Sequence, residues 1–410
     1  MRTILYVIIG LILQQTIYAQ SDYLYQIGKK DKVYSNILNE TRDVYVQLPY
    51  NYNIKSKEKY PVIYILDGDV LLPTVVNIHD FYSGGFMPEM IIVGISNAEN
   101  RTRDLTTSKI TSRRGMTYNQ ENGEAKNFLS FIKTELIPYI EGKYPATNYR
   151  TLIGHSYAGL FTIYTMLNQP DLFANYISID PSLDWDDQKI MKQAKSDFLK
   201  KDLKGKGLFM SLGGQLHMQD SSITLDNVMQ NESEYTLFAR SIIELDEFID
   251  NNESIGLNYE WQFYANDLHG TIPQPSIKDG LIALFEWYQM ENTYAINNPE
   301  TSINELIRII ENREAKLKAH FGYSVPPYPQ DLLNMSGYIS MEMEQPDKSK
   351  MYFEKAIQYY PESANVYDSM ADYYESIKEY SKALQYVNKA FEISNSDYHK
   401  DRKEKLQKLL

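Results

Sequence analysis

Cysteine is absent from this sequence of 410 residues, which excludes disulfide bonds, thiol nucleophiles and cysteine-based metal sites. Histidine is scarce, with six copies, and the histidines and acidic residues show no metal-ligand spacing such as H-E-x-x-H. We therefore expect no metal and no organic cofactor. Lysine and arginine number 41 against 54 acidic residues, a net charge of -13 that argues against a nucleic-acid-binding or anionic-membrane surface.

Long apolar runs are also scarce, and the one that exists lies at the N-terminus. Residues 1–19 combine the positive charge of Arg2, the apolar stretch 4–13 and the small residue Ala19. That order is typical of a secretory signal peptide. No later run is long enough to cross a bilayer, so we expect an exported protein, secreted or periplasmic, with no membrane span after cleavage.

The rest of the chain has the composition of a folded protein, with 43% hydrophobic and 13% aromatic residues. Alternating or continuous apolar runs predict strands at 33–38, 42–48, 60–66, 90–95, 176–179, 207–212 and 258–264. Apolar residues at helical spacing predict helices at 127–140, 237–248 and 282–290. The first two strands form a hairpin. The later alternation of strands and helices predicts an α/β fold, with a mostly parallel sheet covered by helices on both faces.

Beyond about residue 299 the sequence becomes charged and rich in tyrosine, and strand runs end. A shift of the chain by 34 residues, the tetratricopeptide period, pairs small and apolar positions: Gly337 with Ala371, Phe353 with Val387, and Ala356 with Ala390. We predict an α/β domain at 20–298 and a helical domain at 299–410 with two repeats, capped by helices at 301–320 and 397–410. This helical domain could bind a peptide or protein partner, or pack against the first domain.

The stretch 149–160, which reads Y-R-T-L-I-G-H-S-Y-A-G-L, is the most informative segment of the sequence. Its pattern predicts a strand, a sharp turn with Ser156 at the tip, and a helix. Such a turn strains the serine backbone and exposes its Oγ, which is the arrangement of a nucleophile. The motif is G-x-S-x-A. Gly154 and Ala158 are small, as the close approach of strand and helix requires.

A serine nucleophile needs a base, and in this architecture the base follows the last strand. His269 lies just past the predicted strand 258–264, so we predict that it takes the serine proton. His217 is the alternative base. His155 stands inside the serine motif, and we expect it to support the turn instead.

The remaining members of such a site are less clearly marked. Tyr157, directly after the predicted nucleophile, is expected to donate one backbone N–H to the oxyanion. The other is expected from Gly68 or Asp69, in a tight turn directly after the strand 60–66. The acid is expected after the strand 207–212, but the next five residues contain no carboxylate. Asp220 is the first acid beyond them and our first choice. The alternatives, all left open, are Glu232, Glu234, Asp180 at the end of the preceding strand, and a Ser–His dyad without an acid.

Several motifs occur in the order seen in one family of α/β-hydrolases. They are Y-P-V-I-Y-I-L-D-G-D (60–69), R-T-R-D-L-T (101–106), F-I-K-T-E-L-I-P-Y-I-E (131–141), R-T-L-I-G-H-S-Y-A-G-L-F (150–161), D-P-S-L (180–183) and D-L-H-G (267–270). Over about residues 30–290 the chain thus resembles the esterase D/enterochelin-esterase-like family. The resemblance implies an α/β-hydrolase fold with Ser156 as nucleophile and His269 as base. The chain departs from the family at Asp180, where serine is usual, and at Asp184, where tryptophan is frequent.

The resemblance also bounds the function. Members of the family cleave small carboxylic esters, such as siderophore trilactones and acyl or feruloyl esters on sugars, and some relatives are acyltransferases. We therefore predict an exported serine esterase acting on a small-molecule ester. The alternatives are a non-catalytic binding protein that kept the hydrolase fold and an acyltransferase. Loops such as 98–122 are expected to line the pocket, and loops vary too freely to identify the substrate.

Overall fold

The computed structural model describes residues 27–50, 52, 58–217 and 219–410. The predicted signal peptide, 1–19, lies outside the described residues. The chain divides into two compact units, one ending at Gln289 and one beginning at Met290. The domain boundary predicted after residue 298 therefore falls inside the second unit.

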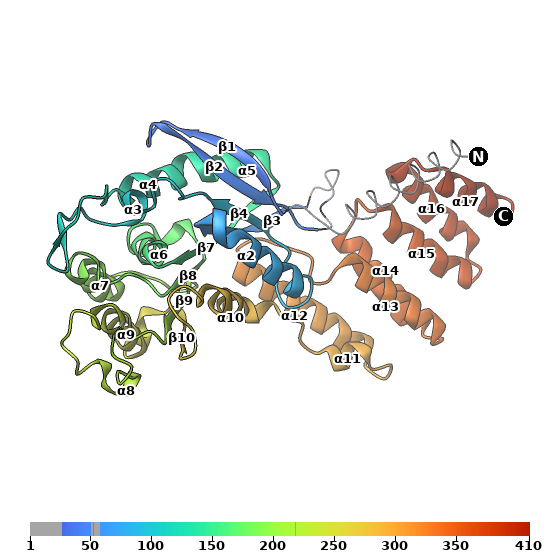
Figure 1. Ribbon diagram of the computed structural model, residues 1–410. Coiled ribbons are helices and arrows are strands. Elements are labelled where there is room, and N and C mark those ends of the chain that lie inside the picture. The colour runs from blue at the N-terminus through green and yellow to red at the C-terminus, as the bar shows by residue number, and fades with distance from the viewer. Residues whose placement is uncertain (1–26, 51, 53–57, 218) are drawn as a thin grey trace, which may run out of the picture. The chain divides into compact units, whose positions relative to one another are not determined.

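The first unit is built on an eight-stranded sheet with the order β1-β2-β4-β3-β7-β8-β9-β10 (Figure 1). The strands are β1 (Lys29–Ser35), β2 (Glu40–Gln47), β3 (Tyr60–Leu66), β4 (Ile91–Ile95), β7 (Ala146–His155), β8 (Asn175–Ile179), β9 (Gly207–Gly213) and β10 (Asn258–Tyr264). β1 and β2 form the predicted antiparallel hairpin, and β2 pairs antiparallel with β4. The six strands from β4 to β10 are parallel to one another. The prediction of a mostly parallel sheet is confirmed.

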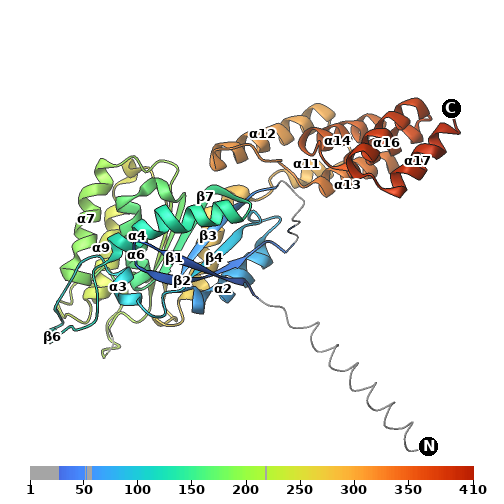
Figure 2. The same cartoon turned by 90° about the horizontal axis from the view of Figure 1, so that it is seen from above.

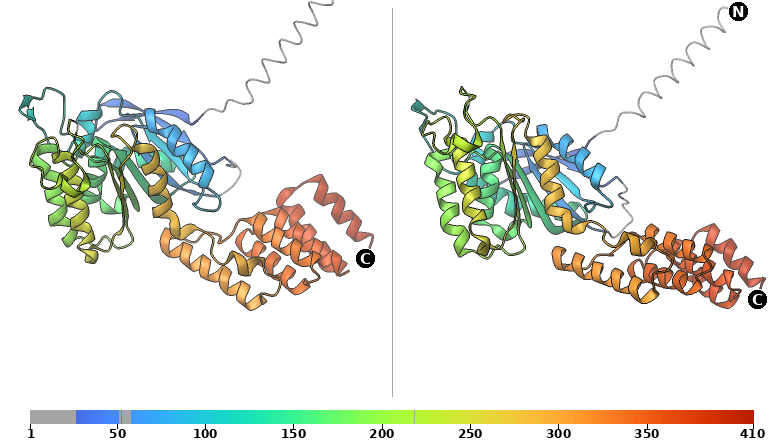
Figure 3. Two further views of the ribbon diagram at one scale, coloured as in Figure 1. Left: turned by 60° about the horizontal axis from the view of Figure 1, so that its bottom comes forward. Right: turned by 90° about the horizontal axis from the view of Figure 1, so that it is seen from below.

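Helices cover both faces of this sheet, as Figure 3 shows. The helices of the first unit are α2 (Gly68–Tyr82), α3 (Arg101–Leu105), α4 (Ala125–Phe131), α5 (Ile137–Lys143), α6 (Tyr157–Asn168), α7 (Trp185–Asp197), α8 (Leu225–Val228), α9 (Leu237–Asp250) and α10 (Pro273–Phe285). Neighbouring residues of β8 identify the two faces. Ile177 packs toward Gly280 of α10, whereas the Ser178 hydroxyl donates to the carbonyl of Gly159 in α6. Successive side chains of a strand point to opposite faces, so α6 and α10 lie on opposite sides.

Three elements differ from the sequence-based prediction. The turn expected after Leu66 leads directly into α2, which packs so closely that a Cβ on Gly68 would lie 2.5 Å from the backbone of Gly94. The helix expected at 127–140 is α4 and α5 joined by a π-helical segment, Ile132–Leu136. The last helix, expected at 282–290, is α10 and ends at Phe285.

Two further short strands, β5 (Ser112–Arg113) and β6 (Met116–Thr117), form a hairpin of their own. This hairpin extends from the first unit, away from the large sheet (Figure 2). It lies within the 98–122 segment expected to line the pocket.

The second unit is entirely helical within the described residues. Its helices are α11 (Thr293–Asn297), α12 (Ile303–Phe321), α13 (Gln330–Glu342), α14 (Pro346–Tyr359), α15 (Ala364–Ser376), α16 (Tyr380–Ser394) and α17 (Asp397–Gln407). Gly337 of α13 allows Phe353 of α14 to pack closely, because a Cβ there would lie 2.4 Å from the ring. Within the part of the chain that the structure describes, no helix has the length and apolar character needed to cross a membrane.

Candidate active site

Ser156 occupies the sharp turn between β7 and α6. Its backbone has φ 63° and ψ -116°, a conformation that L-residues rarely adopt and that stores strain. The turn is held because the Ser156 N–H donates to the Ile179 carbonyl at 2.9 Å. Strand and helix meet so closely that a Cβ on Gly154 would lie 2.2 Å from the Ala158 carbonyl oxygen. The small residues of the motif are therefore a steric requirement of the turn.

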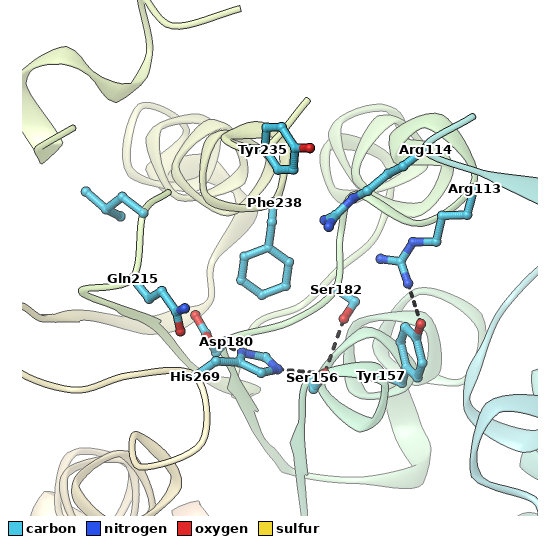
Figure 4. A pocket seen from close by; sticks show the side chains of 11 residues that line it. Arg113, Arg114, Ser156, Tyr157, Asp180, Ser182, Gln215, Tyr235, Phe238 and His269 are labelled. Carbon is cyan, nitrogen blue, oxygen red and sulfur yellow. Dashed lines mark hydrogen bonds and ion pairs between the residues drawn. The ribbon is translucent and has the colours of Figure 1, made fainter. Parts of the chain in front are cut away.

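His269 and Asp180 complete a continuous chain of contacts with this serine (Figure 4). The Ser156 Oγ lies 3.0 Å from Nε2 of His269, on the loop after β10. Nδ1 of the same ring lies 2.5 Å from Oδ2 of Asp180, which follows β8 directly. Asp180 is 2% exposed, and its Oδ1 accepts a hydrogen bond from the Gly213 N–H at 3.0 Å. Serine hydroxyl, imidazole and buried carboxylate are thus joined in the order that serine hydrolases use.

The first choice for the acid, Asp220, is not brought to His269. Its exposed carboxylate accepts hydrogen bonds from the backbone N–H and the hydroxyl of Ser222, at 2.9 and 2.6 Å. Glu232 and Glu234 are exposed as well. The carboxylate in contact with the imidazole is Asp180, which the sequence left among the alternatives. Asp220 cannot take this place because its own turn holds it at the surface.

Two other histidines were considered from the sequence. Nδ1 of His217 accepts hydrogen bonds from the backbone N–H groups of Gln219 and Asp220, at 3.0 and 2.9 Å, so this ring serves its own loop. The ring of His155 lies 4.6 Å from that of His269. Burial, and then the neighbouring His269, lower the pKa of His155 to about 4, so this ring is neutral at pH 7.

The ligand atoms of His155, Asp180 and His269 lie within 4.8 Å of one another, a spacing that could hold a metal ion. Both nitrogens of His269 already have partners, however, in the serine and the carboxylate. The same three residues therefore fit the serine-hydrolase arrangement without an ion.

The residues predicted to hold an oxyanion lie around the same turn. Tyr157 follows the nucleophile as the first residue of α6. The turn that carries Gly68 and Asp69 is linked to it by Arg101, which donates to both carboxylate oxygens of Asp67 at 2.9 Å and to the His155 carbonyl at 3.0 Å. Their role as donors stays a prediction.

A cavity of about 340 Å³ opens above the serine (Figure 4). Besides Ser156, Tyr157, Asp180 and His269, its walls contain Arg113, Arg114, Ser182, Gln215, Leu216, Tyr235 and Phe238. The Ser182 hydroxyl lies 3.4 Å from the Ser156 Oγ. Sequence reasoning did not single out the arginines, although two adjacent basic residues in the 98–122 segment of an acidic chain were a visible signal.

Comparison with known protein families agrees with the resemblance and the repeats found in the sequence. Residues 35–232 match the family described as "Putative esterase". Residues 330–363 and 364–397 each match a tetratricopeptide repeat. The sequence-based resemblance to enterochelin-esterase-like proteins and the prediction of two repeats are confirmed.

Two curated relatives of this chain are siderophore esterases. It is 32% identical over 170 residues to the ferri-bacillibactin esterase BesA of Bacillus subtilis. The aligned region covers 38% of this chain and 59% of that relative. It is 30% identical over 153 residues to the siderophore triacetylfusarinine C esterase of Aspergillus fumigatus, covering 33% of this chain and 49% of the relative. The chain therefore spans about half to three fifths of the length of these relatives.

Solved structures extend the likeness. The crystal structure of an IroE-like serine hydrolase from Shewanella oneidensis has a TM-score of 0.65 and 26% identity, covering 81% of this chain and 99% of that one. An uncharacterised protein from Capnocytophaga ochracea has a TM-score of 0.59 and 20% identity, covering 92% of this chain and 99% of that one. At that identity the second likeness concerns the fold alone.

Proposed function

We propose that this chain is an exported serine carboxylic-ester hydrolase in which Ser156 is the nucleophile, His269 the general base and Asp180 the orienting acid. The observation that carries the proposal is the unbroken series of contacts from the Ser156 Oγ through both imidazole nitrogens to a buried carboxylate. The esterase-family match and the siderophore-esterase relatives support the same chemistry. The hypothesis of a non-catalytic binding protein rested on a missing acid, and Asp180 removes that reason.

The reaction follows from the geometry. His269 Nε2 accepts the hydroxyl proton as the Ser156 Oγ attacks the ester carbonyl, and the tetrahedral intermediate expels the alcohol, to which the imidazolium returns the proton. Water then attacks the acyl-enzyme in the same way and releases the acid. Asp180 keeps the Nδ1–H of His269 directed at its carboxylate, so that Nε2 is the free base, and it stabilises the imidazolium.

The negative charge on the carbonyl oxygen needs backbone donors. We propose the N–H of Tyr157, at the start of α6, as one of them, because the N-terminus of a helix also stabilises negative charge. The second donor is proposed to come from Gly68 or Asp69. The link from Arg101 to both Asp67 and the His155 carbonyl supports this, since it fixes that turn beside the serine turn.

As substrate we propose an ester of the siderophore type. The support is the pair of relatives whose names state that activity. Purified mature protein should release product from ferri-bacillibactin faster than from a feruloyl sugar ester. The opposite preference would redirect the assignment toward acyl-sugar esters without touching the proposed reaction.

The reaction itself is tested by labelling with a fluorophosphonate and locating the adduct by peptide mass mapping. We expect one adduct, on Ser156, and neither label nor ester turnover in Ser156→Ala. Ser130→Ala, the same change at a half-buried position of α4, should label and turn over like the wild type. A folded wild-type protein that takes no label, or a Ser156→Ala variant with full turnover, would refute the proposal.

Export has its own test. Expressed with residues 1–19 in a Gram-negative host, the protein should be recovered from the periplasm with Gln20 as its first residue, as N-terminal sequencing would show. Recovery from the cytoplasm with Met1 retained would contradict it.

A further inference from the structure

The charges that face the cavity are unevenly distributed. The β5–β6 hairpin brings Arg113 and Arg114 to one wall. Among the described residues of the lining, the acidic side chain is Asp180, which contacts His269. Outside the lining, the buried Asp184 contacts both arginines. One carboxylate is thus shared by two guanidinium groups, so the arginine wall of the cavity carries a net positive charge, while the negative charge of Asp180 lies at the imidazole.

Arg113 is held in place by the protein. It donates to the Asp184 Oδ2 at 2.9 Å and to the phenol of Tyr157. Its guanidinium carbon also lies 5.2 Å from the ring centre of Trp185 and 5.5 Å from that of Tyr157. Two hydrogen bonds and two aromatic rings thus fix this guanidinium as part of the wall of the site.

Arg114 is held much more loosely. Its one ion pair runs to the Asp184 Oδ2, at 3.5 Å, an oxygen that Arg113 already occupies at 2.9 Å. Its side chain is 33% exposed, against 23% for Arg113. A partly exposed ion pair of this length contributes little to stability. Figure 4 shows the Arg114 side chain extending over the cavity on the side of Phe238, while Arg113 turns to Tyr157.

We propose that Arg114 is the binding residue for an anionic oxygen group of the substrate, a carboxylate or an ionised phenol. The inference rests on the proposed esterase function and names the substrate class of that site. Arg114 can exchange its long contact with Asp184 for a bidentate, charge-assisted contact with the ligand, which is the geometry that a guanidinium favours. Arg113 stays in place and keeps Asp184 neutralised during that exchange. The site therefore selects negatively charged esters over neutral ones of the same shape.

The ester bond divides a substrate into an acyl half and an alcohol half, and the anion could belong to either. Two matched pairs of esters separate these cases. For the acyl half, the glutaric acid monoester of phenol is compared with phenyl valerate. For the alcohol half, 3-carboxyphenyl butyrate is compared with its neutral analogue 3-carbamoylphenyl butyrate. Product release is followed by chromatography, and kcat/KM is measured at low ionic strength.

The wild type should prefer the anionic member of one pair by roughly 10-fold or more, because charge-assisted hydrogen bonds to a guanidinium are strong even when partly solvated. Salt at ~0.5 M should erode the preference. Arg114→Gln should abolish the preference by lowering kcat/KM for the anionic ester much more than kcat/KM for the neutral ester. Arg114→Lys should restore part of it. Arg308→Gln, the same change at an exposed position of α12, should behave like the wild type.

Equal kcat/KM for both members of both pairs in the wild type would overturn the proposal, as would an Arg114→Gln variant that slows neutral and anionic esters alike. A binding measurement keeps this test independent of turnover. By calorimetry, Ser156→Ala should bind the anionic ester more tightly than its neutral partner, and the additional Arg114→Gln change should remove the difference. If Ser156→Ala binds the anionic and the neutral ester equally well, the anion site is refuted. If fluorophosphonate does not label Ser156 in the wild type, the proposed hydrolase function is refuted instead.

Discussion

Replacing Asp180 with asparagine changes one atom at the contact that orients the base. The amide oxygen of the new residue can still accept the Gly213 N–H, at present 3.0 Å from Oδ1. The amide nitrogen then takes the place of Oδ2, 2.5 Å from Nδ1 of His269. An N–H group there forces Nδ1 to be the acceptor. Nε2 must then carry the hydrogen, and it can no longer take the proton of Ser156.

The size of the loss follows from that tautomer change. The corresponding substitution in the serine-protease triad lowers kcat about 10⁴-fold, which corresponds to about 5.5 kcal/mol in the activation free energy. We expect a fall of the same order, ~10³–10⁴, for Asp180→Asn. Folding should be preserved because Asp180 has φ 43°, a left-handed conformation that asparagine adopts readily. Circular dichroism and a thermal melt check this before kcat is measured on an activated aryl ester.

The matched control is Asp220→Asn, the same chemical change at the acid that the sequence favoured. Its carboxylate is exposed and contacts Ser222, so kcat should stay within about twofold of the wild type. The assignment of Asp180 is wrong if this variant loses activity as severely as Asp180→Asn, or if Asp180→Asn keeps more than a tenth of the wild-type kcat.

Three further predictions concern stability. Burial lowers the pKa of His155 from 6.5 to about 4, so the unfolded chain binds the extra proton at a higher pH than the folded protein does. The free energy of unfolding should therefore fall by up to ~3 kcal/mol as pH drops from 6.5 to about 4. Urea titrations at several pH values should show a weaker dependence of this free energy on pH for His155→Gln, and an equal dependence would contradict the shift. Gly154→Ala forces a Cβ against the Ala158 carbonyl and should cost about 2–3 kcal/mol in urea unfolding, whereas Gly142→Ala, with open space around it in α5, should be neutral or stabilising. Arg402→Gln leaves the carboxylates of Asp368, Asp372 and Glu375 without their shared cation, so hydrogen exchange of α17 should accelerate at least tenfold, while Arg308→Gln at an exposed pair should leave it unchanged.

The elements that sequence analysis predicted well are those whose pattern has one interpretation. The continuous apolar run 60–66 coincides with β3, which is buried at every position. A strand that helices cover on both faces is apolar at every position, so the ends of the apolar run in the sequence mark the ends of the strand. The helical repeats were visible for a similar reason, because close packing demands small residues, such as Gly337 against Phe353, at a fixed period.

Two of the elements that were missed, in whole or in part, contain residues that normally interrupt helices. α2 begins at Gly68, which looked like a turn, and includes Pro73. The first half of α10 was missed because Pro273, Pro275 and Gly280 stand in it. Pro273 occupies the first turn, where no N–H partner is needed. Gly280 is required because a Cβ there would lie 2.9 Å from the ring of Phe209. Gly68 and Gly280 are needed for close contacts with distant parts of the chain. A local sequence pattern contains no information about such contacts.

The position of the acid shows the same limit in the site itself. Sequence reasoning looked for a carboxylate after β9 and found Gly213 and Gly214. A Cβ on Gly214 would lie 2.1 Å from the Ala265 carbonyl oxygen, and the Gly214 N–H donates to the Asp267 carbonyl at 2.8 Å. The loop that carries His269 therefore lies directly on these glycines. This loop follows β10, and it can cross the end of β9 and reach β8 because the two glycines lack side chains. There it meets Asp180, whose Oδ1 accepts a hydrogen bond from the Gly213 N–H. The end of β9 thus leaves space for the His269 loop and donates a hydrogen bond to Asp180. The carboxylate itself follows β8, which is one strand closer than β9 to the strand that precedes Ser156.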